Sequence, residues 1–314
     1  MTDLTRREIS KVTALTNPVS GHGAAVAAAQ TAIARLHHRG VEVVEIIGDS
    51  AEDARYLVSA ALEKGTDAVM VTGGDGVISN ALQVLANTDV PLGIIAAGTG
   101  NDHAREFAIP TKDPEAAADI IIDGWTETID LGRIQWSEGR KKSDKWFGTV
   151  AAAGFDSLVT DRANRMRWPH GRLRYYLAML AELSQLRLLP FRLVLDGTPD
   201  GTKVIDADIT LAAFGNTRSY GGGLLICPNA DCTDGLLDIT MAHSDSRTKL
   251  VRLFPTVMKG THVELDEVST ARAKSIHVEC PGINVYADGD FACLLPAEIY
   301  AVPAALQILR PNRP

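Results

Sequence analysis

The chain is poor in cysteine, and its few cysteines form no metal or disulfide pattern. The 314 residues contain four, without any C-x-x-C pair: Cys227, Cys232, Cys280 and Cys293. This spacing argues against a zinc knuckle and against a disulfide framework. We therefore expect free thiols in a reducing cytosol.

Basic charge is also scarce. The chain has 31 Lys and Arg residues against 39 Asp and Glu residues, which gives a formal net charge of −8. A protein that coats nucleic acid needs a net basic surface, so nucleic acid is not an expected partner.

Long apolar runs are missing as well. The longest, such as 90–97 and 178–183, fall far below the roughly 18 residues that a membrane-spanning helix needs. Residues 1–11 are polar and charged and predict no signal peptide. We expect a cytoplasmic protein, with any contact to the inner face of the membrane being peripheral.

What is present is an ordinary globular composition, with 46% hydrophobic and 22% charged residues. At about 150 residues per domain, the length predicts about two domains. The first 130 residues alternate apolar strands with helical patterns. The expected strands are 12–16, 41–47, 68–71 and 92–96, and the expected helices are 24–38, 51–64 and 77–85. This alternation predicts a doubly wound α/β domain around a parallel sheet.

Beyond Asp130 the pattern changes to β-prone segments separated by Gly, Pro and Asp turns. These segments are 146–153, 191–195, 203–213, 236–241, 275–278 and 283–287. They predict a second, mainly antiparallel β-sandwich domain. The hydrophilic stretch 137–145 is expected to be a surface loop near the boundary, and 304–309 a last strand.

Three glycine-rich loops follow strands of the first domain. They are Asn17–Gly21, Gly73–Gly76 and Gly98–Asp102. A single such loop could be only a tight turn, but three at one sheet edge favour a phosphate cradle, since glycine lets backbone amides approach an anion. The candidate nucleotide-binding residues are Asn17, Ser20, Gly73, Gly74, Gly76, Gly98, Thr99 and Asn101. Neither the lysine-ended P-loop nor the GxGxxG fingerprint occurs.

The motifs along the whole chain follow one another in a distinctive order. The chain carries NPVSG, GGDG, PLGIIAAGTGNDHAR, FGTVAAAGFDSLVTDRAN, GNTRSYGGGLLICPNADCTDGLLDI and VYADGD. In this order they resemble the diacylglycerol kinase catalytic family of bacterial lipid kinases, to which sphingosine and ceramide kinases are related. The resemblance implies an ATP-binding α/β domain at 10–133 with a returning strand at 303–311, and a β-rich lipid- and metal-binding domain at 134–302.

The resemblance also implies roles for acidic residues. Asp75 and Asp102 match acidic positions at the phosphoryl-transfer centre, and Asp290 stands where the family has a glutamate that acts as general base. A structural Mg²⁺ would be held by the residues Asp234, through its side chain, and Asp231 and Leu236, through their carbonyls, with Asp130 linked to it through water. From the residues alone, Asp130 and Asp234 could equally be ordinary turn residues.

Three positions depart from the family pattern. Val77 replaces a hydroxyl residue, Asn80 replaces a glutamate, and Asp290 is one methylene shorter than the usual base. These changes bear on rate and nucleotide preference more than on the class of reaction.

The segment Asp161–Tyr176 is rich in arginine and aromatic residues, which suits an anionic membrane surface or, alternatively, a packed helix with a solvated arginine face. The leading hypothesis is transfer of the γ-phosphoryl group of Mg-ATP to diacylglycerol, giving phosphatidic acid. The alternatives are a soluble-substrate kinase of the NAD kinase type and a nucleotide-binding lipid sensor without turnover. The resemblance also suggests a homodimer.

Overall fold

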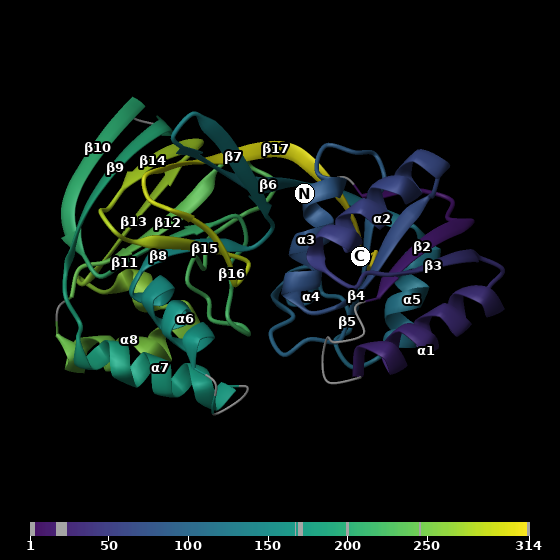
Figure 1. Ribbon diagram of the computed structural model, residues 1–314, viewed down its shortest axis with the longest axis horizontal. Helices are drawn as coiled ribbons and strands as arrows, with labels where there is room; N and C mark the ends of the chain where they lie inside the picture. Colours follow the sequence, from purple (N-terminus) through teal and green to yellow (C-terminus); the bar gives the residue numbers. More distant parts are fainter. Residues whose placement is uncertain are drawn as a thin grey trace. The chain divides into compact units, whose positions relative to one another are not determined.

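The computed structural model describes residues 4–16, 24–166, 168, 172–198, 201–244 and 246–312. The chain divides into two compact units (Figure 1). The first unit comprises Met1–Leu131, Gly221–Gly223 and Pro303–Pro314, and the second comprises Gly132–Tyr220 and Leu224–Val302. Two long strands, β6 (Trp125–Glu138) and β17 (Ala297–Leu309), contribute residues to both units.

The first unit is built on a parallel sheet in the order β17–β5–β4–β2–β3. Its strands besides β17 are β2 (Lys11–Thr16), β3 (Glu42–Ile47), β4 (Ala68–Gly73) and β5 (Leu92–Ala96). All residues of β4 and β5 are buried, as expected for central strands covered on both faces. The end of β17 pairs with β5, where Ile308 lies opposite Leu92. A short strand, β1 (Thr5–Arg6), pairs with the start of β6.

Five helices accompany this sheet. They are α1 (Ala24–His38), α2 (Ala51–Lys64), α3 (Asp75–Leu85), α4 (Asp102–Glu106) and α5 (Pro114–Asp123). The chain runs from β2 to β3 in one direction and then crosses back to β4, so right-handed connections place α1 and α2 on opposite faces. Helix α1 packs with α5, and α2 packs with α3. The reversal creates a switch point between β2 and β4, which is where open α/β sheets bind ligands.

The second unit contains two antiparallel sheets. The first comprises β10 (Gly201–Ile209), β9 (Leu189–Thr198), β14 (Ser275–Glu279) and the start of β17, together with the β6–β7 hairpin in which β7 is Lys141–Phe147. The other has the order β13 (Val268–Ala273), β12 (Leu237–Ala242), β11 (Leu211–Gly215), β8 (Val150–Gly154), β15 (Asn284–Ala287) and β16 (Asp290–Leu294).

One hydrophobic core lies between these two sheets. Phe191 and Leu193 of β9 pack in the same cluster as Phe214 of β11 and Ile239 of β12. The helices of this unit are α6 (Phe155–Arg165), α7 (Arg172–Ser184), α8 (Arg247–Lys259) and the 3₁₀ turn η2 (His262–Glu264). The predicted fold class, an α/β domain followed by an antiparallel β-sandwich domain, is confirmed. Across the described residues, every helix is too short or too polar to cross a bilayer.

Three predicted segments of the second unit were wrong in detail. The expected strands 146–153 and 203–213 are each divided in two, because the chain crosses from one sheet to the other at 148–149 and at 210. The expected loop 137–145 is instead the end of β6, a turn and β7, with Glu138 opposite Lys141. Polarity misled this prediction, since an antiparallel hairpin can expose polar side chains to water.

Candidate active site

Two glycine-rich loops of the first unit touch backbone to backbone. A Cβ atom added to Gly98 would lie 2.3 Å from the Cα atom of Gly74. The second loop ends β4 and leads into α3, and the third ends β5 and leads into α4. Since both strands are central and parallel, their loops emerge at the same sheet edge. A side chain on Gly98 would clash with the backbone of Gly74, so the two loops pack directly against each other at this edge.

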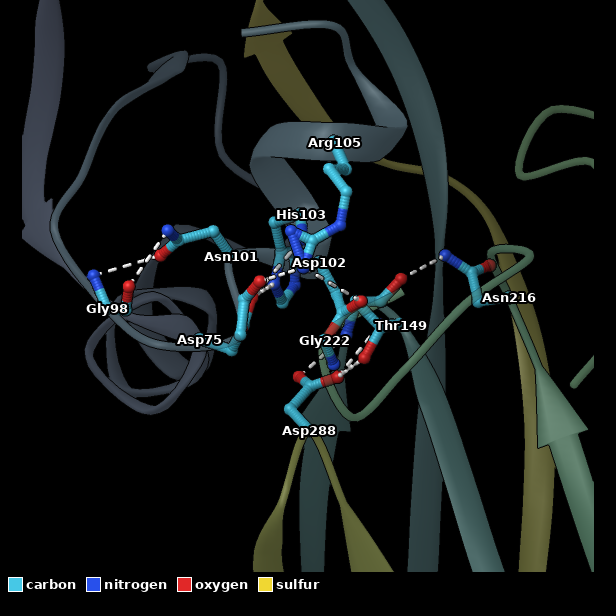
Figure 2. A network of polar contacts seen from close by, with 12 residues as sticks. Asp75, Gly98, Asn101, Asp102, His103, Arg105, Thr149, Asn216, Gly222 and Asp288 are labelled. Carbon is cyan, nitrogen blue, oxygen red and sulfur yellow. Dashed lines mark hydrogen bonds and ion pairs between the residues drawn. The ribbon is translucent and has the colours of Figure 1, made fainter. Parts of the chain in front are cut away.

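Asn101 braces the third loop (Figure 2). Its side-chain oxygen accepts a hydrogen bond from the amide of Gly98 at 2.9 Å, and its Nδ2 donates to the carbonyl of the same residue at 2.9 Å. Asn101 has a φ of 57°, a left-handed conformation that Asn tolerates better than most residues. The loop is therefore held in one shape before any ligand binds.

The carboxylate of Asp75 is held by a histidine that the sequence analysis did not single out. The backbone amide of His103 donates to Asp75 Oδ1 at 3.2 Å, and His103 Nδ1 lies 3.0 Å from the same oxygen. Burial acts to raise the pKa of Asp75, but the hydrogen bonds and charge of His103 outweigh it and hold that pKa below its ordinary value. Asp75 is thus kept ionised and fixed in orientation.

Asp102 binds the triglycine segment Gly221–Gly223, which belongs to the first unit. Its two carboxylate oxygens accept hydrogen bonds from the amides of Gly222 and Gly223, each at 2.8 Å. Arg105 lies 3.9 Å from the same carboxylate and donates to the carbonyl of Gly100. Asp102 is 4% exposed. Its buried charge is therefore compensated by backbone amides, and its role in this structure is to position a loop.

The other predicted nucleotide-binding residues are placed as follows. Gly73 ends β4, Gly76 lies in the first turn of α3, and Thr99 is exposed at the tip of the third loop. Asn17 and Ser20 lie outside the described residues.

In the second unit, the predicted base Asp290 follows a tight hairpin turn. Asp288 and Gly289 connect β15 to β16, and their φ values of 51° and 84° fit the two-residue turn that favours Asp-Gly. The Asp288 carboxylate accepts hydrogen bonds from the amides of Gly148 and Thr149 at 2.9 and 2.8 Å, and from the Thr149 hydroxyl at 2.6 Å. These bonds, drawn in Figure 2, fix the turn that carries Asp290.

The pKa of Asp290 is shifted in the direction that favours its action as a general base. Desolvation by surrounding protein raises the pKa of Asp290 above its ordinary value; the Lys145 ammonium opposes this shift and the Asp288 carboxylate adds to it. Lys145 is held nearby through a 3.1 Å hydrogen bond to the carbonyl of Phe291. A carboxylate with a raised pKa can take a proton more readily, as general-base chemistry requires.

The predicted magnesium ligands lie in the loop before β12. The Asp234 carboxylate accepts a hydrogen bond from the amide of Leu236 at 2.9 Å and pairs with Arg272. Burial, and then the charge of Asp231, raises the pKa of Asp238 to about 6. Negative charge thus exceeds what Arg272 balances, and the oxygen donors are of the type that Mg²⁺ prefers. Among the described residues no group of three or more His, Cys, Asp or Glu side chains is placed to hold a metal ion, so a cation in this loop would depend on Asp234 and backbone carbonyls.

Asp130 lies in the first unit, at the end of the part of β6 that belongs there. It is 3% exposed, and its Oδ1 accepts a hydrogen bond from the amide of Ala304 at 2.8 Å. In this structure Asp130 therefore fastens β17 to β6.

Sequence reasoning missed three residues that organise the site: His103, Arg105 and Asp288. All lie inside the quoted motifs, within three positions of a predicted acidic residue. His103 had no local signal for its contact, because its partner Asp75 lies 28 positions earlier, in the first turn of α3. Asp288 binds amides from a distant chain segment and had no local signal, whereas Arg105 contacts Gly100 and Asp102, which are close to it in the chain.

Comparison with known proteins agrees with this architecture. One family model, the diacylglycerol kinase catalytic domain, matches residues 11–134, and a second, the YegS C-terminal NAD kinase beta sandwich-like domain, matches residues 149–310. A curated diacylglycerol kinase from Mycobacterium tuberculosis (strain ATCC 25618 / H37Rv) is 79% identical over 309 residues, which is 98% of each chain. A curated diacylglycerol kinase from Bacillus subtilis (strain 168) is 25% identical over 94% of this chain and 95% of its own.

Solved structures share the fold. A diacylglycerol kinase from Bacillus anthracis str. Sterne superimposes with a TM-score of 0.71 at 21% identity, covering 98% of both chains. Yeast NADH kinase superimposes with a TM-score of 0.53 at 12% identity, covering 99% of this chain and 89% of that one. The fold and the family matches together define a two-domain kinase of the lipid kinase class. The chain belongs to the diacylglycerol kinase family.

Proposed function

We propose that the protein transfers the γ-phosphoryl group of ATP to the hydroxyl group of diacylglycerol, giving phosphatidic acid. The observation that carries this proposal is the 79% identity, over 98% of both chains, to a protein named diacylglycerol kinase. The glycine loops at the ends of β4 and β5 support it, since glycine lets backbone amides approach phosphate oxygens closely.

In this reaction the first unit binds and orients ATP. The amides at Gly74 and in the first turn of α3 would contact the phosphates, which carry several negative charges, while the Gly98 amide is held by Asn101. Asp75, oriented by His103, would define where the phosphate group and its cation can sit. Asp102 would keep the triglycine segment against the third loop.

The second unit supplies the base. Asp290 would take the proton of the lipid hydroxyl as its oxygen attacks the γ-phosphorus and the bond to the ADP oxygen breaks. Mg²⁺, when bound, neutralises phosphate charge. Asp234, with the carbonyls of Asp231 and Leu236, would hold a structural ion, and the proton transfer itself needs only Asp290 and the acceptor hydroxyl.

A soluble-substrate kinase of the NAD kinase type is the second candidate. The observation that favours it is the fold shared with yeast NADH kinase, at a TM-score of 0.53. The two activities differ in the acceptor, which is apolar in one case and a dinucleotide in the other, so they are separable by supplying one acceptor at a time.

The test is incubation of the full chain with γ-labelled ATP and Mg²⁺, with diacylglycerol in neutral mixed micelles or with NAD. Label in the organic phase with diacylglycerol is the expected result, and it should disappear in Asp290→Asn. Label on NAD alone would establish the second candidate. Nucleotide binding without label in either acceptor would contradict both and favour a lipid sensor.

A further inference from the structure

Helix α8 of the second unit differs in charge from the chain that contains it. Its 13 residues include Arg247, Lys249, Arg252 and Lys259 and no acidic residue, in a protein of net charge −8. Such a helix has a strongly positive surface, whereas the protein as a whole repels anions. The positive charge of α8 therefore points to a specific role, because the acidic remainder of the chain already keeps the protein soluble.

The outward face of α8 is apolar along its middle. Val251 and Met258 are each 58% exposed, and Pro255, one turn after Val251, is exposed as well. Their spacing of four and then three residues places them in one stripe along the helix. The opposite side is anchored by Leu253, which is buried. Packing within the second unit thus uses one side of α8 and leaves a continuous apolar stripe on the other.

Three cations flank this stripe. On a helical projection, Arg247 lies on one side of Val251 and Met258, and Arg252 and Lys259 lie on the other side of Pro255. All three are exposed, and across the described parts of the chain none of them forms an ion pair, although the Arg247 guanidinium donates a hydrogen bond to the carbonyl of Ser184. Lys249, which lies off this face, differs because it pairs with Glu267 at 2.8 Å. The charges beside the stripe are therefore available to an external anion.

We propose that this face of α8 docks on the surface of an anionic lipid bilayer. The proposal rests on the proposed function in one respect, namely that a diacylglycerol substrate resides in a bilayer. An apolar stripe between cations matches the boundary between acyl chains and anionic headgroups, where apolar side chains enter and Lys or Arg contact phosphates. The acidic surface of another protein would complement the charge of the cations, but it would offer no apolar surface to the exposed side chains of Val251 and Met258.

The α6 part of the arginine-rich segment Asp161–Tyr176 is a weaker docking surface than α8. Arg162 pairs with Glu182, and Arg165 pairs with Asp161 at 3.1 Å. These pairs neutralise charge within the protein, so this part of Asp161–Tyr176 attracts anionic lipid less than α8 does. These two arginines belong to α6, and Arg167 of the same segment lies outside the described residues.

The test is co-sedimentation of the full chain with phosphatidylcholine vesicles, with and without phosphatidylglycerol. We expect binding only to the anionic vesicles. Arg247→Gln/Arg252→Gln/Lys259→Gln should weaken it roughly 100-fold, from about fivefold per cation. The matched control is Arg140→Gln/Lys141→Gln/Lys142→Gln, which removes the same charge from the exposed β6–β7 hairpin of the same unit and should retain most of the binding.

The apolar stripe is tested separately with Met258→Cys carrying an environment-sensitive dye. The four native cysteines are buried, so labelling is selective. Emission should shift to the blue on anionic vesicles. Equal loss of binding in both charge variants, or no dye shift on bound protein, would overturn the proposal, as would a wild-type protein that ignores anionic vesicles.

Turnover in neutral mixed micelles separates this proposal from the proposed function. The α8 charge variant should phosphorylate diacylglycerol there at the wild-type rate, because neutral micelles offer no anionic surface. A protein that binds anionic vesicles through α8 but phosphorylates no lipid would contradict the proposed function and leave the docking surface intact. A protein that phosphorylates lipid in micelles but does not bind anionic vesicles would contradict the docking surface and leave the proposed function intact.

Discussion

His103 Nδ1 lies 3.0 Å from Asp75 Oδ1, and it joins the first turns of two helices that follow neighbouring strands. The His103 side chain is 3% exposed and that of Asp75 is 17% exposed. A hydrogen bond to a charged group at such low exposure is stronger than one at the surface. The pair therefore fixes the acidic group that stands at the mouth of the glycine loops.

Replacing His103 should separate its polar role from its packing role. His103→Leu removes the Nδ1 contact, and we expect kcat/KM for ATP to fall about 10-fold or more, since a hydrogen bond to a charged group contributes about 1.5–3 kcal/mol. His103→Asn keeps a donor near the Nδ1 position and should restore much of the loss. Equal activity in both variants would limit His103 to packing.

The same pair gives a pH dependence. The pKa of Asp75 is lowered in the folded protein, so the stabilisation is present above the unfolded pKa and is lost as pH falls through the lower folded value. In His103→Leu the side-chain contact and charge that lower the pKa of Asp75 are removed while burial still raises it, so the loss of stability at low pH should be smaller or absent. Urea unfolding of both proteins between pH 3 and pH 6 measures this, within the window set by an ordinary Asp pKa of about 4. The same pH dependence of the free energy of unfolding in both proteins would contradict this expectation.

Asp102→Asn should loosen the triglycine segment. Asn offers one carbonyl oxygen where the two amides of Gly222 and Gly223 now find two carboxylate oxygens, so one amide loses its acceptor. We expect the free energy of unfolding to fall by about 1–3 kcal/mol. Hydrogen exchange should show the amides of Gly222 and Gly223 exchanging faster, while those of β4 stay protected. Unchanged protection at the two glycines would refute the positioning role.

Asp290→Asn should abolish turnover while ATP still binds, with a loss of about 10²–10⁴-fold typical of a general base. In the wild type the pKa of Asp290 is raised, so the base form is populated above that value and activity should increase as pH rises through it. Isothermal titration with ATP and a pH–rate profile are the measurements. Substantial activity in Asp290→Asn would remove this residue from the role of base.

Gly98→Ala should damage nucleotide binding through a direct clash. The new Cβ would lie 2.3 Å from Gly74 Cα, so the two loops must separate. Overpacking of this kind costs about 1–3 kcal/mol, and we expect weaker ATP binding together with lower stability. Gly282→Ala is the control, because a Cβ there has open space and only backbone strain at φ 73°. The control should leave ATP affinity unchanged.

A second pH effect is expected on the β-sandwich. His277 lies between two carboxylates, with Nδ1 2.6 Å from Glu298 and Nε2 2.9 Å from Glu279. Partial burial lowers the pKa of His277, but these two partners outweigh it and raise that pKa. The stabilisation is therefore complete below the unfolded pKa and is lost as pH rises through the folded one. His277→Gln should lower Tm at pH 6 more than at pH 8, whereas His37→Gln, at the exposed end of α1, should not.

The sequence by itself determined the α/β domain, its strands and the three glycine loops. Short continuous apolar runs such as 68–71, alternating with helical patterns, are typical of buried parallel strands, and the loops follow from glycine and chain order. It also located the acidic residues within those loops. Local patterning carries this information because a strand, a helix or a turn is defined by residues a few positions apart.

Only the tertiary structure decided what those acidic residues do. Asp102 reaches amides 120 residues away, and Asp288 reaches the amides of Gly148 and Thr149 from a separate hairpin. Packing also decided which side of α8 remains exposed. Hydrogen bonds and exposure depend on segments that are distant in the chain, and no local pattern encodes which of them will meet.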